Sequence, residues 1–155
     1  MGYSIACEDG IKMARIEESV EINCPIEKAF AYTTDARNWS KWNTALPEAE
    51  QTSEGPVGIG STFKGTAHLM GRSMAWTAKV TDYEANKKFG KNIDSGLVLI
   101  EQYNTYTPTK DGVKFTIVYD MKITGCLRLL SPMIVNSMRK ELKKSLINVK
   151  QILES

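Results

Sequence analysis

A single long amphipathic helix, predicted over residues 131–154, constrains the fold more than any other feature of this chain. Apolar residues recur there at spacings of three and four, which is the period of one helix face. The stripe consists of Ile134, Met138, Leu142, Leu146, Val149 and Leu153. Ser131 is expected as the N-cap and Pro132 as the first helical residue. At 1.5 Å per residue the helix is about 36 Å long, enough to cross an entire sheet.

Most of the sequence before this helix alternates between apolar and polar residues, the pattern of strands with one buried face. Segments rich in glycine or proline separate the alternating stretches and predict turns. We expect strands at residues 14–22, 46–54, 62–69, 73–80, 87–94, 97–107 and 113–123. The pattern is weak over 87–94, and over 97–107 it does not decide which face is buried.

Two short helices are predicted after the first strand. Pro25 suits the first turn of a helix over 25–33, because its missing N–H would be unpaired there in any case. Asp35 is a good N-cap for a second helix, which carries Trp39 and Trp42 on one side. These two indoles either pack the short helices or gate the mouth of a cavity.

This order of elements predicts an α+β fold with helices segregated to one face of an antiparallel sheet. We expect a curved antiparallel sheet of about seven strands wrapped around the long C-terminal helix. A helix lying across such a sheet leaves a hollow that can hold a ligand. The length of 155 residues fits one domain, which we place at 13–155, after a loose N-terminal extension over 1–12. Whether Met13 is an alternative start stays open.

Composition excludes several classes of protein. With 20 basic and 18 acidic residues, the net charge of +2 argues against nucleic-acid binding driven by bulk charge. No apolar run approaches the roughly 20 residues that span a bilayer, and no signal peptide is recognisable. Three scattered cysteines and a single histidine predict no metal site, and no cofactor is expected. A cytoplasmic location fits best, and the oligomeric state is undecided.

Three stretches carry a resemblance to a known superfamily. They are VEINCPIEKAFAYTTDARNWSKWN (20–43), GPVGIGSTFKGTAHLMGRSMAWTAKVTDYEANKKF (55–89) and GCLRLLSPMIVNSMRKELKKSLINVKQILES (125–155). In this order and spacing they resemble the START-like SRPBCC superfamily, whose members have the helix-grip fold. The branch most similar to this chain is that of the polyketide cyclases and dehydrases, and the resemblance covers about residues 13–155.

The resemblance implies a function only in outline. Members of the superfamily bind lipids, sterols, polyketides, hormones or quinones in the cavity between sheet and helix, and some catalyse cyclisation, dehydration or hydrolysis. It implies binding or carriage of a small hydrophobic molecule. The alternative is an enzyme of the cyclase or dehydratase type that uses acid and phenol groups of the cavity. The superfamily has no universal catalytic motif, so no catalytic residue is transferred.

The candidate ligand-binding residues are those that alternation or the helix stripe turns inward. They are Glu18, Val20, Phe63, Leu69, Trp76, Phe115, Ile117, Tyr119, Met121, Ile134, Met138 and Leu142. The alternative is that the same side chains simply fill a core. If they line a ligand pocket, its volume is expected to be about 300–1,000 Å³.

Glu18 and Tyr119 are the candidates for catalysis. Glu18 shares a strand face with apolar residues, so a carboxylate there would be desolvated and could act as an acid, a base or a ligand anchor. The alternatives are that the sheet edge or a twist leaves it in water, or that a basic partner satisfies it. Tyr119 could donate a hydroxyl hydrogen bond into the pocket, as could Tyr103 or Tyr106. Strand parity places His68 on the outer, solvated face.

Overall fold

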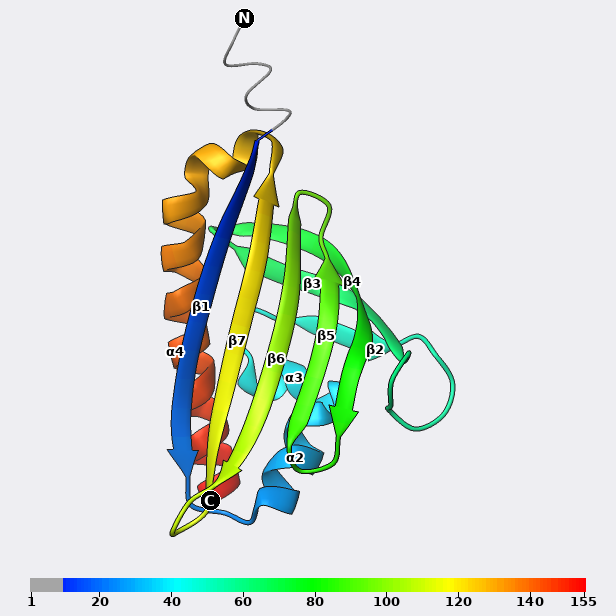
Figure 1. The fold of residues 1–155 in the computed structure, drawn as a ribbon, viewed down its shortest axis with the longest axis vertical. Coiled ribbons are helices and arrows are strands. Elements are labelled where there is room, and N and C mark those ends of the chain that lie inside the picture. Colours follow the sequence, from blue (N-terminus) through cyan, green and yellow to red (C-terminus); the bar gives the residue numbers. More distant parts are fainter. Residues whose placement is uncertain (1–9) are drawn as a thin grey trace, which may run out of the picture.

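One antiparallel sheet of seven strands forms the frame of the protein (Figure 1). The computed structural model describes residues 10–155. The sheet order is β1-β7-β6-β5-β4-β3-β2. The strands are β1 (Ile11–Ile22), β2 (Glu48–Gln51), β3 (Thr62–Leu69), β4 (Arg72–Glu84), β5 (Lys88–Asp94), β6 (Val98–Pro108) and β7 (Val113–Thr124). This number and pairing confirm the predicted sheet.

The helices confirm the predicted plan, with small shifts at their ends. They are α2 (Ile26–Thr34), α3 (Ala36–Trp42), the 3₁₀ helix η1 (Gly125–Leu130) and α4 (Ser131–Glu154). Asp35 caps α3 as predicted, accepting a hydrogen bond from the backbone N–H of Arg37 at 3.0 Å. Ser131 is the first residue of α4 rather than its N-cap, because η1 leads directly into the helix.

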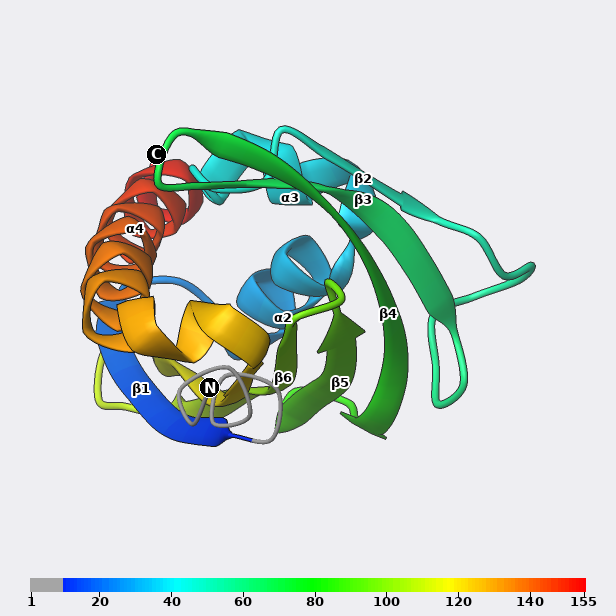
Figure 2. The same ribbon diagram turned by 90° about the horizontal axis from the view of Figure 1, so that it is seen from above.

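The sheet curls around the helices, as seen from above in Figure 2. A break in register between Val80 and Asp82 bends β4 where it pairs with β5. α4 lies alongside the edge strand β1 and closes the open side of the curl (Figures 1 and 2). The protein therefore has the α+β helix-grip fold, with α4 held in the concave face of the sheet.

The predicted N-terminal extension falls mostly on residues 1–9, which lie outside the described part of the chain. Its last residues are in the sheet, because β1 begins at Ile11 and pairs with β7 from there onward. The first strand is thus three residues longer at its start than the alternation over 14–22 predicted.

The space between sheet and helices is solid at the end that α2 and α3 cover. Aromatic rings fill it in edge-to-face, tilted and stacked pairs: Phe30, Trp39, Trp42, Phe63, Phe89, Tyr106 and Phe115. Trp39 and Trp42 are both buried in this cluster, so they pack the short helices against the sheet. A smaller cluster of Val98, Ile123 and Ile134 lies near the start of α4. The less completely filled space lies between these two clusters.

Candidate ligand-binding cavity

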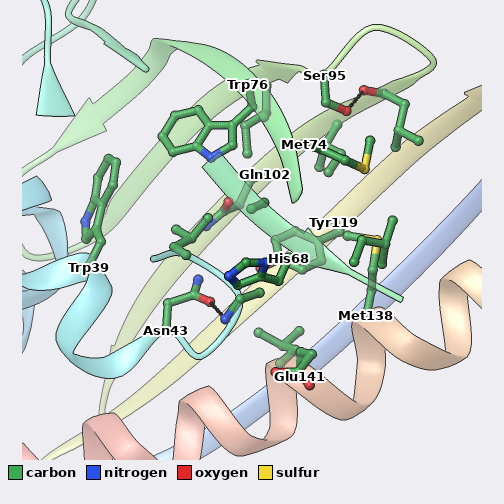
Figure 3. Close-up of a pocket in the computed structure, with 18 of the residues that line it drawn as sticks. Trp39, Asn43, His68, Met74, Trp76, Ser95, Gln102, Tyr119, Met138 and Glu141 are labelled. Carbon is green, nitrogen blue, oxygen red and sulfur yellow. Dashed lines mark hydrogen bonds between the residues drawn. The ribbon is translucent and has the colours of Figure 1, made fainter. Parts of the chain in front are cut away.

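A cavity opens between α4 and the concave face of the sheet (Figure 3). It is lined by residues of β3 to β7, by Thr33 of α2 and Trp39 and Trp42 of α3, by the segment after α3, and by α4 from Met138 to Leu142. Its volume is about 120 Å³, smaller than the predicted range. The reason is that the aromatic rings of Trp39, Trp42 and their neighbours occupy the inner end of the hollow.

Five of the residues predicted from the sequence line this cavity. Leu69 and Trp76 come from β3 and β4, Tyr119 from β7, and Met138 and Leu142 from α4. They are placed there by alternation on the strands and by the helix stripe, as expected. Their surfaces make one side of the wall predominantly apolar, which is typical of ligand pockets.

The other predicted residues support the cavity without lining it. Phe63, Phe115, Ile117 and Met121 are completely or almost completely buried in the main core. Ile134 belongs to the smaller cluster at the start of α4, and Val20 packs against the main core. Inward-facing parity therefore identified the correct side of the sheet, but it could not separate side chains covered by neighbours from those that border the hollow.

Glu18 does not face the cavity, and the expectation that it would is corrected by the structure. Its Oε2 accepts a hydrogen bond from the Arg139 guanidinium of α4 at 2.8 Å, in a partly exposed ion pair. The residue does point inward on β1, but α4 packs on that edge strand and brings Arg139 opposite it. The Glu18 carboxylate thus lies at the interface between β1 and α4.

Strands β5 and β6 contribute residues that were not predicted from the sequence. Lys91 and Ile93 of β5, and Ile100, Gln102 and Asn104 of β6, all line the cavity. Lys91 and Gln102 are directly paired across the two strands. Lys91 shares a strand face with the apolar residues Phe89 and Ile93, because the three positions are two apart. The weak alternation of β5 therefore already indicated that Lys91 points inward.

Lys91 is a buried lysine without a counter-charge among residues 10–155. The residue is 6% exposed, and its ammonium lies 3.7 Å from the centre of a Trp39 ring and 5.6 Å from that of Phe89. Among residues 10–155 it has no hydrogen-bond or ion-pair partner. Because burial penalises its charged form, the pKa of the Lys91 amine is lowered to about 7.

Two indole N–H groups of the cavity wall also lack acceptors among the described residues. They are Nε1 of Trp42 and Nε1 of Trp76, both fully buried. Buried donors are nearly always hydrogen-bonded in folded proteins, so each such group calls for an explanation. Both indoles belong to residues of the cavity wall, and their N–H atoms are buried behind its surface.

Tyr119 adds a phenol to the wall. Its hydroxyl has no hydrogen-bond partner among the described residues, and burial raises the pKa of the phenol to about 12. Tyr119 is therefore a neutral donor or acceptor at physiological pH. Tyr106, by contrast, is buried beside the cavity with its hydroxyl hydrogen-bonded to Thr33 at 2.6 Å, and Tyr103 lies outside it.

Polar acceptors of the wall are partly engaged with one another. Gln102 Nε2 donates to Asn104 Oδ1 at 2.9 Å. Nearer solvent, His68 and Glu141 border the cavity together with Asn43 (Figure 3). His68 is exposed, as strand parity predicted, yet it also borders the opening, because the end of β3 approaches the segment after α3.

The described residues offer little else for cofactor chemistry. Within residues 10–155 no group of three or more His, Cys, Asp or Glu side chains could hold a metal ion. None of the helices in this part of the chain has the length and hydropathy needed to cross a bilayer.

The family follows from a match over almost the whole domain. A family model described as "Polyketide cyclase / dehydrase and lipid transport" matches residues 13–154. The chain belongs to this family. The match confirms the resemblance inferred from the three sequence stretches, and it covers every element that lines the cavity. No curated protein sequence matches the chain closely enough to count as a relative.

Solved structures share the fold of this polyketide cyclase/dehydrase and lipid transport family member at low sequence identity. TTHA0849 from Thermus thermophilus superposes with a TM-score of 0.75 at 14% identity, over 92% of this chain and 97% of that one. Ara h 8.0201 gives 0.70 at 15% identity, covering 92% and 98%. The di-domain ARO/CYC BexL from the BE-7585A biosynthetic pathway gives 0.75 at 9% identity, over 92% of this chain and 50% of that one.

Proposed function

We propose that this protein binds or carries a small hydrophobic molecule, lipid-, polyketide- or quinone-like, in the cavity between α4 and the sheet. The observation that carries the proposal is the composition of the cavity wall. Apolar side chains such as Met74, Ile100 and Met138 predominate, and a few buried donors without partners stand among them. A pocket of this kind suits an apolar body with one or two oxygen atoms.

The wall is also suited to adapt to a ligand larger than the space seen here. Met74 and Met138 are unbranched and flexible, and their thioethers repack easily around different shapes. The family description, which includes lipid transport, supports the same proposal. A cytoplasmic location for this activity stays a prediction.

Native mass spectrometry of the purified protein tests the proposal. We expect a co-purified molecule to add mass to the protein, and we expect Met138→Trp to remove it by filling the cavity. Met133→Trp is the matched control, because Met133 lies on the same helix but is exposed outside the cavity. A protein that carries no adduct and binds no hydrophobic probe would contradict the proposal.

A second candidate is an enzyme of the polyketide cyclase or dehydratase type. The observation that favours it is the presence of an acid, a phenol and an amide around one cavity: Glu141 of α4, Tyr119 of β7 and Gln102 of β6. Such groups can move protons during cyclisation and loss of water. Incubation with a linear poly-β-ketone analogue distinguishes the two functions. An enzyme would release a product lighter by one water, with Tyr119→Phe slower, whereas a carrier leaves the compound unchanged.

A further inference from the structure

Lys91 places a positive charge where an apolar core would normally exclude one. Lysine is almost never fully buried unless a negative group accompanies it, and here the ammonium lies against the rings of Trp39 and Phe89. These rings stabilise the cation in part, but they leave its N–H donors without an oxygen acceptor. The electrostatics of this wall therefore favour a negatively charged oxygen.

Two further donors lie in the wall of the same cavity. The indole N–H groups of Trp42 and Trp76 are buried there and have no acceptor among residues 10–155. Hydrogen bonds from an ammonium to an ionised oxygen are stronger than those between neutral groups. The apolar side chains of Met74, Ile93 and Ile100 lie on the same wall. An amphiphile with an acidic oxygen at one end and a hydrocarbon body matches this distribution.

We propose that Lys91 anchors an acidic oxygen of the ligand, a carboxylate or an ionised phenol or enol, and so selects among hydrophobic molecules. The proposal rests on the ligand-binding function proposed above. It assigns a ligand class to the cavity, and it gives Lys91 a role that a purely structural contact with Trp39 would not need.

A proton linkage follows from the proposal. With a pKa near 7, the amine is only partly protonated at pH 7.5, and a bound anion favours its charged form. Binding of an anion should therefore take up a fraction of a proton. The other titratable groups that line the cavity are His68 of β3, Tyr119 of β7 and Glu141 of α4. None of these forms an ion pair or hydrogen bond with Lys91.

Titration calorimetry with three probes tests the proposal: 2-naphthoate, 2-naphthol and the neutral 2-acetylnaphthalene. Each is titrated at pH 7.5 in two buffers of different ionisation heat, which reveals proton exchange with the solvent. Naphthoate is ionised before it binds and should take up a fraction of a proton, whereas naphthol is neutral before it binds and should give its proton to the unprotonated amine or release it where the amine is already charged. We expect at least one of the two oxygen acids to bind roughly tenfold or more tightly than the ketone, because a hydrogen bond to a charged group is lost in the ketone. Preference for naphthoate assigns a carboxylate site, and preference for naphthol assigns a phenol site.

Two lysine variants separate the anchor from the cavity. Lys91→Met should abolish both the preference and the proton exchange while keeping affinity for the ketone. Lys88→Met is the matched control, because Lys88 lies on the same strand over the Tyr103 ring but outside the cavity. It should behave like the unaltered protein.

The outcomes distinguish this proposal from the function on which it rests. Ketone binding without any preference for an acid, or a preference that survives Lys91→Met, overturns the role of Lys91 and leaves the hydrophobic cavity intact. Failure of all three probes to bind contradicts the ligand-binding function itself.

Discussion

Gly65 lies directly opposite Trp76 on the paired strands β3 and β4. A Cβ atom at position 65 would come within 2.7 Å of the Trp76 ring and would also collide with the backbone carbonyl of Glu48. The absence of a side chain thus lets the indole lie across β3 while β2 pairs on the far side. Gly65, which has no side chain, therefore determines where the Trp76 ring lies in the cavity wall.

Gly65→Ala is expected to destabilise the protein by about 1–3 kcal/mol, because overpacking forces backbone and ring to shift. It should also alter the tryptophan fluorescence of the folded state. Gly58→Ala is the control, since a Cβ there meets nothing within 4 Å. Urea denaturation of both variants measures the difference, and equal stability of the two would contradict this view of Trp76.

Leu142 lies in the middle of the buried stripe of α4 and is 2% exposed. Leu142→Ala should lower the free energy of unfolding by about 2–5 kcal/mol, through lost burial and the space left behind. Ile147→Ala on the same helix, at a residue 55% exposed, should change it by less than about 1 kcal/mol. Chemical denaturation compares the two, and similar losses would show that the stripe is misassigned.

Lys91 should make the free energy of unfolding increase as the pH rises. Between its folded pKa of about 7 and its usual value of 10.5, the unfolded chain binds a proton that the folded chain has released. Stability relative to Lys91→Met should therefore rise with pH across this window, by up to about 1.4 kcal/mol per pH unit. Below pH 7 the full cost of burying the charge remains, so Lys91→Met should be the more stable protein there.

Denaturation of both proteins from pH 6 to 10 checks this expectation. The comparison with Lys91→Met cancels the contributions of the other titrating groups. A stability difference that stays constant over this range would mean that the Lys91 amine titrates as it does in water.

Glu18→Gln should leave ligand binding unchanged, because the ion pair with Arg139 lies outside the cavity. A partly exposed ion pair contributes little, so the variant should lose less than about 1 kcal/mol of stability. Arg139→Gln should have a similarly small effect on binding. Both variants are compared with the unaltered protein by their affinity for 2-acetylnaphthalene and by urea denaturation. A marked loss of affinity would show that Glu18 takes part in ligand binding after all.

Much of the fold could be predicted from periodicity, because the signals are local. The stripe from Ile134 to Leu153 needs only the sequence of α4, and the alternation around Phe115 needs only that of β7. Asp35 and Pro25 mark helix starts by backbone chemistry alone. These features specify which face each element buries, and the structure confirms them.

The cavity could be predicted only in part, because its limits depend on packing between distant elements. Met121 and Met138 both point inward, yet one is covered by neighbours and the other borders the hollow. Glu18 meets Arg139 only because α4 lies on β1. Lys91 is a charged residue on the otherwise apolar inner face of β5. It therefore weakened the alternation from which its own inward position could have been predicted.

The most direct test of the ligand cavity uses its methionines as reporters. Met74 and Met138 line the cavity, Met121 is buried outside it, and Met133 is exposed. The protein is labelled with ¹³C at its methionine methyl groups and titrated with 2-acetylnaphthalene, and each methyl resonance is assigned by substitution. Our account predicts that the Met74 and Met138 signals shift together and saturably, while those of Met121 and Met133 stay in place. Saturable shifts confined to Met133, or no shifts at all, would contradict it.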